Sequence, residues 1–190
     1  MEHSRRVWWF RAVVATLALL VSGTSSAAEP APTQREGKFE VRFMTDMIDH
    51  HMMAIMMAEH CLDKAVHPEL IEMCEEIIAA QTAEMELMQG WLQDWYGISY
   101  EPEMPPGMHR MMERLASLAP EDFEITFMQM MIRHHWQAVI EGEHCLDRAY
   151  HPELLQTCSD IVSAQTEEIA TMQEWLCEWY GRCRQGPQVQ

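Results

Sequence analysis

The chain contains an internal repeat, and this repeat restricts its possible folds more than any other feature. Residues 43–97 align with residues 127–181 without a gap, and 30 of the 55 positions are identical. Each copy has two apolar patterns with helical spacing, separated by a His-Pro pair and closed by a Tyr-Gly pair. One helical hairpin cannot bury its apolar face alone. The repeat therefore predicts an all-α fold in which two tandem hairpins dock as a four-helix bundle.

The breaks within each copy give the bounds of the long helices. We expect them at about 37–64, 68–96, 119–149 and 152–180. Pro68 and Pro152 suit the first turn of a helix, whereas Gly97 and Gly181 suit left-handed C-terminal caps. The proline-rich linker 98–119 carries one short expected helix, and it is long enough to cross from one hairpin to the other.

The N-terminal residues match a secretory signal peptide. Three arginines precede an apolar run of ten residues, 12–21, and a stretch of small residues that ends at Ala28. A run of ten is too short for a membrane span, which takes about 20 residues. We expect cleavage after Ala28 and a periplasmic or secreted protein without a membrane span, with an uncleaved anchor as the alternative. The expected parts are then a signal peptide (1–28), a flexible leader (29–38), the bundle (39–183) and a tail (184–190).

The net charge argues against two classes of partner. Residues 1–28 contain Glu2 and three arginines, a balance of +2, so cleavage would change the net charge from −17 to −19. Such acidity disfavours nucleic acid and anionic lipid surfaces, and it weakly concentrates cations. The sequence therefore predicts a protein that does not bind nucleic acid.

Six cysteines in an exported chain predict disulfides rather than thiolate metal ligands. Two lie on either side of the turn in each hairpin, and two flank Gly181. The predicted bridges are Cys61–Cys74, Cys145–Cys158 and Cys177–Cys183.

The first two bridges set the register of each hairpin. If Cys61 faces Cys74, then Met47 is level with Met88, His50 with Met85, His51 with Glu84, and Ala54 with Gln81. The same relation in the second hairpin pairs Met131 with Met172, His134 with Ile169, His135 with Glu168, and Ala138 with Gln165. Each hairpin is thus expected to gather methionine, histidine, glutamine and glutamate at one height.

This grouping favours a site for soft metal ions. Thioethers together with imidazoles suit Cu(I), and Ag(I) by its similar softness. The predicted ligands are Met47, His50, His51 and Met88, and in the second copy Met131, His134, His135 and Met172. Adjacent residues on a helix point about 100° apart, so the two histidines of a pair cannot point the same way. Only one histidine of each pair therefore needs to bind the metal directly. A core with hydrogen-bonded histidines is the alternative.

Polar residues on the partner helices are expected to support the histidines. Glu84 and Glu168 are predicted to accept an N–H from His51 and His135 and thereby to fix the rings. Gln81 and Gln165 lie among apolar residues, and a buried amide needs hydrogen-bond partners that a histidine network would supply.

These motifs resemble a known family. Phe-x-x-x-Met-Ile-x-His-His on one helix, with Gln-x-x-Glu-x-x-x-Met on the next, is similar to the family called domain of unknown function 305. The resemblance covers most of 39–181 and implies a ferritin-like helical bundle in a periplasmic protein that binds copper and silver. It points to the histidines, glutamines, glutamates and methionines already named, and it adds Met57. Glu141 stands at the position equivalent to Met57 in the second copy.

Two further methionine clusters and the tryptophans complete the candidate features. Met53, Met56, Met57 and His60 are spaced as an outer thioether site on the first helix. A separate cluster in the linker comprises Met104, Met108, His109, Met111 and Met112. The alternative for both is packing, because methionine is a flexible core filler. Trp91, Trp95, Trp175 and Trp179 are expected to plug one end of the bundle, and His67 and His151 are expected to be structural.

The sequence therefore predicts a periplasmic protein, not an enzyme, that binds Cu(I) or Ag(I). It would sequester the metal or pass it to a copper efflux protein or chaperone. A metal-free interaction module of the cell envelope is the first alternative. A ferritin-like di-iron oxidase is the second, but such sites need two Glu-x-x-His motifs. Only residues 141–144 have that spacing.

Overall fold

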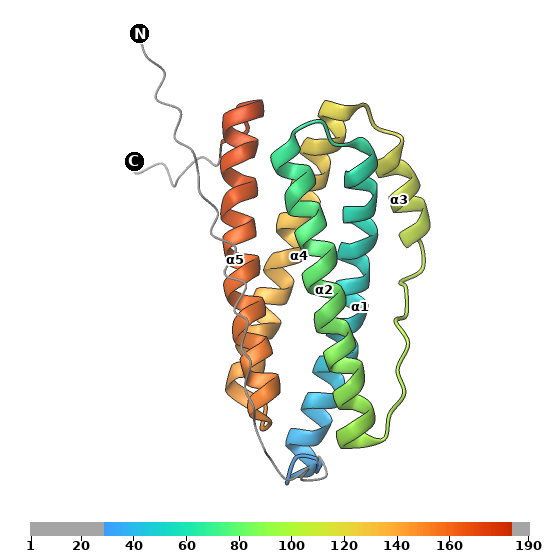
Figure 1. Ribbon diagram of the computed structural model, residues 1–190, viewed down its shortest axis with the longest axis vertical. Helices are drawn as coiled ribbons and strands as arrows, with labels where there is room; N and C mark the ends of the chain where they lie inside the picture. Colours follow the sequence, from blue (N-terminus) through green and yellow to red (C-terminus); the bar gives the residue numbers. More distant parts are fainter. Residues whose placement is uncertain (1–28, 184–190) are drawn as a thin grey trace, which may run out of the picture.

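The computed structural model describes residues 29–183, and this part of the chain is helical (Figure 1). Its five helices are α1 (Gln34–Lys64), α2 (Pro68–Tyr96), α3 (Met108–Ala116), α4 (Pro120–Arg148) and α5 (Pro152–Tyr180). No β-strand occurs within residues 29–183, which confirms the predicted all-α class. The predicted signal peptide and the predicted tail, residues 184–190, lie outside the described residues.

The long helices begin and end at residues that the sequence marks. Pro68 and Pro152 lie in the first turns of α2 and α5, where a backbone N–H would have no helical partner to lose. Gly97 and Gly181 follow the last turns with φ angles of 65° and 64°. Glycine adopts this left-handed conformation without the steric cost of a Cβ atom.

Helix α1 begins about one turn earlier than predicted. The side chain of Thr33 accepts a hydrogen bond from the backbone N–H of Glu36, and the Glu36 carboxylate accepts one from the N–H of Thr33. This capping box starts the helix at Gln34, so the helix includes the second half of the predicted leader. The start of the leader is also held, because the carbonyl of Glu29 accepts a hydrogen bond from Nε2 of His151 at 2.9 Å.

Three disulfides have the predicted pairings. They join Cys61 to Cys74, Cys145 to Cys158, and Cys177 to Cys183. In the first two, the Cα atoms are 6.4 and 6.2 Å apart across the two helices of a hairpin. Each of these two bridges therefore fixes which residues of the paired helices lie at the same height.

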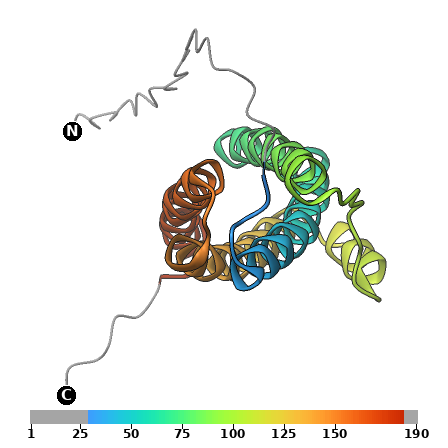
Figure 2. The ribbon, with the colours of Figure 1, turned by 90° about the horizontal axis from the view of Figure 1, so that it is seen from below.

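The two hairpins dock mainly through α1 and α4. These helices are antiparallel, since the start of each contacts the turn at the end of the other. By contrast, α2 and α5 make few contacts with each other. The short helix α3 packs outside the four long helices, against α1 and α4 (Figure 2). The centre of the structure is therefore the α1–α4 interface, with one hairpin on each side.

A buried glutamate at the start of α4 holds the turn of the first hairpin. Glu124 accepts hydrogen bonds from the backbone N–H groups of Val66 and His67 at 2.6 and 2.9 Å. It also accepts from Nδ1 of His67 at 2.7 Å and from the hydroxyl of Tyr180. The His67 ring stacks on Trp179, with the ring centroids 3.9 Å apart. We call this group of residues the Glu124 lock.

The Glu40 lock is its repeat equivalent. Glu40 accepts hydrogen bonds from the backbone N–H groups of Tyr150 and His151 at 2.7 and 2.9 Å, and from Nδ1 of His151 at 2.6 Å. The hydroxyl of Tyr96 also donates to Glu40. The ring of His151 stacks on Trp95 at 3.8 Å. Each hairpin thus contributes a glutamate to the other and receives one in return.

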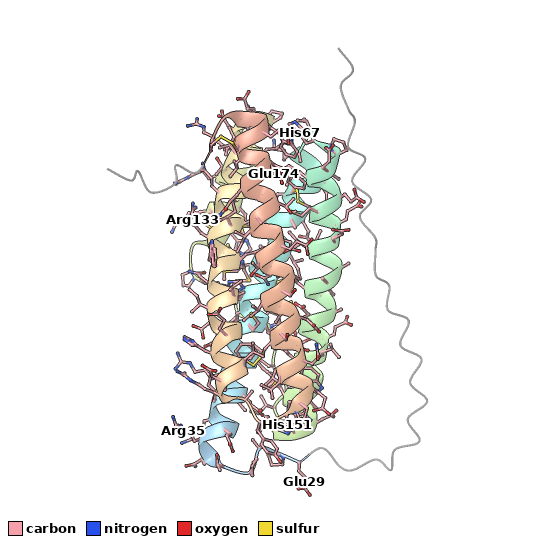
Figure 3. All side chains as sticks on the ribbon, turned by 90° about the vertical axis from the view of Figure 1, so that its left-hand side faces the viewer. Glu29, Arg35, His67, Arg133, His151 and Glu174 are labelled. Carbon is pink, nitrogen blue, oxygen red and sulfur yellow. A yellow bond between two sulfur atoms is a disulfide. The ribbon has the colours of Figure 1, made fainter. Side chains whose placement is uncertain are left out.

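The tryptophans lie at both ends of the structure and not at one end as predicted. Trp95 stacks on His151, and Trp179 stacks on His67. Figure 3 shows His67 and His151 at opposite ends of the molecule. The prediction was wrong because it did not include the antiparallel arrangement of the hairpins, which separates the two copies of the motif. The structural role expected for both histidines agrees with their positions in the locks.

Acid is expected to weaken the locks. Burial alone would raise the pKa of Glu124, but hydrogen bonds from Tyr180 and His67 outweigh it and lower that pKa. The pKa of Glu40 is lowered in the same way. A carboxyl group with a lowered folded pKa stabilises the fold above its unfolded pKa, near 4.5, and this contribution is lost as the pH falls below that value.

We therefore expect the free energy of unfolding, measured by urea titration, to decrease as the pH falls from about 5 to 3. The decrease should be smaller in the Glu124→Gln variant, because that side chain has no charge to lose. An equal decrease in both proteins would show that Glu124 does not contribute to acid sensitivity.

Candidate metal centre

The two His-His pairs meet where α1 crosses α4. The rings of His50 and His134 stack, with centroids 3.5 Å apart. Nε2 of His50 donates a hydrogen bond to the backbone carbonyl of His134 at 3.0 Å. Because the helices are antiparallel and related by the repeat, the crossing brings the same pair from each hairpin to the same place.

The second histidine of each pair points into its own hairpin. His51 and His135 are fully buried. Nε2 of His51 lies 2.7 Å from Oε2 of Glu84, in a hydrogen bond. Nε2 of His135 lies 2.6 Å from Oε2 of Glu168, close enough for an ion pair but without the alignment of a hydrogen bond. Each histidine thus lies beside the glutamate that the register predicted, but only His51 and Glu84 form the predicted hydrogen bond.

The contact with Glu84 determines which nitrogen of His51 is available. A carboxylate accepts hydrogen bonds, so Nε2 carries the ring proton and Nδ1 keeps a lone pair. Nδ1 of His51 is buried and has no hydrogen-bond partner among residues 29–183. We call such an atom an open nitrogen. Metal-binding histidines commonly have one nitrogen held by a carboxylate or a carbonyl and the other on the metal.

Three more histidines at the crossing have buried ring nitrogens without a hydrogen-bond partner among residues 29–183. The atoms are Nδ1 of His50, Nδ1 of His135, and both Nδ1 and Nε2 of His134. Nε2 of His135, which is near Glu168 as described above, also lacks an aligned partner within the described residues. A buried polar atom without a partner is costly, so each ring with a free lone pair is suited, by itself, to a ligand that accepts that lone pair.

His50 and His134 are held in the neutral form. Burial lowers the pKa of His50 to about 3, with a further contribution from the positive charge that His51 and His135 could carry. Burial and the neighbouring histidines lower the pKa of His134 to about 2. Neutral imidazole is the form that binds a metal ion, so these rings need not release a proton first at neutral pH.

Buried methionines lie on the helices that carry the histidine pairs and on the partner helix of each hairpin. Met47 and Met88 belong to one buried cluster, with 3% and 0% of their surface exposed. Met131 and Met172 are fully buried in the other cluster. Met57, which the family resemblance added, lies in that second cluster and apart from Met47. The predicted methionine ligands of the first hairpin, Met47 and Met88, thus lie in one cluster. Those of the second hairpin lie in the other cluster, together with Met57.

Carboxylates and cysteine thiolates do not form a metal site in the described residues. Within residues 29–183, no three His, Cys, Asp or Glu side chains are placed to hold a metal ion. All six cysteines are in disulfides. Glu141 and His144, the Glu-x-x-His pair, form a 3.5 Å contact on the surface, with side chains 59% and 44% exposed. A metal site at the crossing would therefore depend on imidazoles and thioethers.

The two buried glutamines lack the hydrogen bonds to histidine that were predicted for them. Gln81 and Gln165 are each 3% exposed. The carbonyl oxygen of Gln81 and both amide atoms of Gln165 have no partner in the part of the chain that the structure describes. The predicted histidine network does not reach them, because His51 and His135 turn towards Glu84 and Glu168 instead. Both side chains therefore keep buried polar atoms without a partner.

Two important residues were not predicted from the sequence. Glu40 and Glu124 position the hairpins and thereby the crossing histidines. The signal was present, since the repeat extends upstream to Phe39-Glu40 and Phe123-Glu124. An identical glutamate in both copies, inside an apolar pattern, indicates a buried charge with specific partners.

Comparisons with known proteins found a matching family and similar solved structures. Residues 40–176 match the model of the family described as domain of unknown function (DUF305). The structure resembles CopM in its Cu(I)-bound form, with 32% identity, a TM-score of 0.68, and 75% of this chain and 98% of CopM covered. CopM has also been solved with Cu(II) and with Ag. A DUF305 fragment from Deinococcus radiodurans is 28% identical, with a TM-score of 0.65 and 79% and 99% of the two chains covered. None of the curated protein sequences compared with the chain is similar enough to count as a match.

Proposed function

The chain belongs to the DUF305 family, and on that premise we propose that it binds the soft metal ions Cu(I) and Ag(I). We infer that it is exported, that it is a binding protein and not an enzyme, and that it sequesters the metal or passes it to an efflux system. In the described residues, no helix is long and apolar enough to cross a membrane. The proposed domain is a ferritin-like four-helix bundle over residues 39–183.

One observation carries the proposal. Two fully buried imidazoles, His51 and His135, each have Nε2 beside a carboxylate and an open Nδ1. A histidine that served packing alone would have no reason to leave a buried lone pair unused. The surrounding thioethers are ligands that select Cu(I) and similar ions over Mg²⁺ or Ca²⁺.

Each hairpin then holds one proposed site. The first uses Nδ1 of His51 with the sulfur atoms of Met47 and Met88. The second uses His135, Met131 and Met172 in the equivalent positions. Glu84 and Glu168 orient the rings, and Gln81 and Gln165 offer amides nearby. His50 and His134 stack on each other between the hairpins and belong to neither of these two sites.

A titration of the mature protein with Cu(I) against a competing chelator tests this function. The proposal predicts at least two tightly bound Cu(I) ions per chain with all three disulfides intact. CopM binds copper and Ag, so Ag(I) should displace Cu(I) from the same sites. Failure to take up Cu(I) or Ag(I) would contradict the proposal and favour a metal-free module.

Glu84 is expected to support the first site through His51. In the Glu84→Gln variant the amide still occupies the space, but it no longer holds the proton on Nε2 by its charge. Changes of this kind reduce metal affinity by about 10–100-fold. The affinity of the first site for Cu(I) should fall by this factor, as measured by chelator competition. Glu86→Gln, at an exposed position on the same helix, is the control and should have no effect.

A further inference from the structure

The repeat gives the groove between α1 and α4 two equivalent ends. One end is an open cavity of about 160 Å³ beside His50. From α1 it is lined by Phe43, Asp46, Met47 and His50, and from α4 by Gln137, Ala138 and Glu141. We call this end the open groove. Two carboxylates, an amide and an imidazole give it a polar character.

The residues at the other end follow from the repeat, because each position in one hairpin corresponds to the position 84 residues away. The equivalent residues are Phe127, Met130, Met131 and His134 on α4, with Met53, Ala54 and Met57 on α1. Four of the seven pairs are identical. The three that differ all replace a polar residue with methionine: Asp46 by Met130, Gln137 by Met53, and Glu141 by Met57.

Helix α3 covers this second end, which we call the α3 groove. The side chains of Met108 and Met112 on α3 are 7% and 3% exposed. They lie in the same buried cluster as Met57, and Met53 and Met130 pack against that cluster. From the sequence, the methionines of α1 and those of the linker were predicted as two separate candidate sites. In the fold they lie in or against the same buried cluster. The residues that line the open groove all belong to α1 and α4, and among residues 29–183 the linker forms one helix, α3, which lies at the other end.

Burial by α3 explains why the α3 groove is apolar, but not why it contains sulfur. Leucine and methionine have similar volumes and often replace each other at small cost. All three positions nevertheless carry thioethers. The equivalent of His50 here is His134, whose Nδ1 and Nε2 both lack a hydrogen-bond partner among residues 29–183, and in the neutral ring one of these two nitrogens has a free lone pair. Thioethers gathered around a neutral imidazole that lacks a hydrogen bond form a ligand set for a soft monovalent ion.

We propose that the α3 groove is a third metal site, between the hairpins, formed by Met53, Met57 and Met130 with His134. Met108 of α3 closes it from outside. The site takes Cu(I) or Ag(I), so it rests on the proposed function in its choice of metal. It differs from the two hairpin sites because its ligands come from both hairpins. The open groove, with carboxylates at the equivalent positions, does not take these ions.

The test uses the mature protein with ¹³C-labelled methionine methyl groups, titrated with Ag(I) and followed by NMR. A thioether that binds Ag(I) shifts the signal of its own methyl group. The signals of Met53, Met57 and Met130 should shift together, whereas Met44 and Met128, buried core residues, should not. A second measurement counts the Ag(I) ions that remain bound against a chelator. The triple variant Met53→Leu/Met57→Leu/Met130→Leu should bind one ion fewer than the parent.

The matched control removes three other methionines, in the variant Met44→Leu/Met73→Leu/Met128→Leu, and it should bind as many Ag(I) ions as the parent. If only the methyl signals of Met47 and Met88 and their equivalents shift at saturation, the third site is absent and the hairpin sites stand. An unchanged ion count in the first triple variant would overturn the third site in the same way. If Ag(I) shifts no methionine signal at all, the proposed function itself fails.

Discussion

Replacement of His51 by phenylalanine is expected to abolish the Cu(I) site of the first hairpin, whereas replacement of His50 leaves that site in place. Nδ1 of His51 is the open nitrogen inside the hairpin, and its ring is held by Glu84 at 2.7 Å. The His50 ring instead stacks on His134 between the hairpins. Loss of a ligand should exceed the about 10–100-fold effect of losing its hydrogen-bond partner.

Chelator competition on His51→Phe and on His50→Phe measures this difference. We expect the Cu(I) affinity of the first site to fall by more than about 100-fold in His51→Phe. His60→Phe is the control, because His60 lies on the same helix outside the crossing and is only partly buried. If His50→Phe lowers the affinity of this site more than His51→Phe does, the assignment of the ligand within the pair is wrong.

The second large effect concerns stability. Replacement of Glu124 by glutamine removes the charge that accepts four hydrogen bonds from the first hairpin and from Tyr180. Glutamine also replaces one accepting oxygen with an NH₂ group, which cannot accept the hydrogen bonds that the neighbouring N–H and O–H groups donate. Glu124 is fully buried, and breaking a buried charged network typically costs about 3–5 kcal/mol. We expect the free energy of unfolding at neutral pH to fall by this amount.

Urea unfolding of the metal-free, oxidised protein measures the change. The control is Glu121→Gln, which makes the same chemical change at an exposed position in the first turn of α4. It should cost no more than about 0.5 kcal/mol. A loss below about 1 kcal/mol in Glu124→Gln would mean that the lock contributes little to the docking of the hairpins.

Much of this arrangement follows from the sequence because two constraints act locally. The His-Pro turns and the Tyr-Gly ends fix each helix over a few residues. The bridge between Cys61 and Cys74 then fixes the register of the hairpin, which predicted that His51 faces Glu84. The observed 2.7 Å contact confirms that prediction.

The relation between the hairpins could not be predicted in the same way. It depends on contacts between residues far apart in the chain, such as Glu40 with His151, and no local pattern specifies them. For this reason the tryptophans were placed at one end. The stacking of His50 on His134 was not predicted either. The position of α3, which brings the linker methionines to those of α1, was also not predicted.

The most direct test of the central claim is an NMR titration of the ¹⁵N-histidine-labelled mature protein with Ag(I). Without metal, Nε2 of His51 should carry the proton and Nδ1 should show the shift of an unprotonated nitrogen. Binding of Ag(I) should move the Nδ1 signals of His51 and His135 and leave their Nε2 atoms protonated. Nδ1 signals that stay unchanged at saturating Ag(I) would contradict metal binding by these buried histidines.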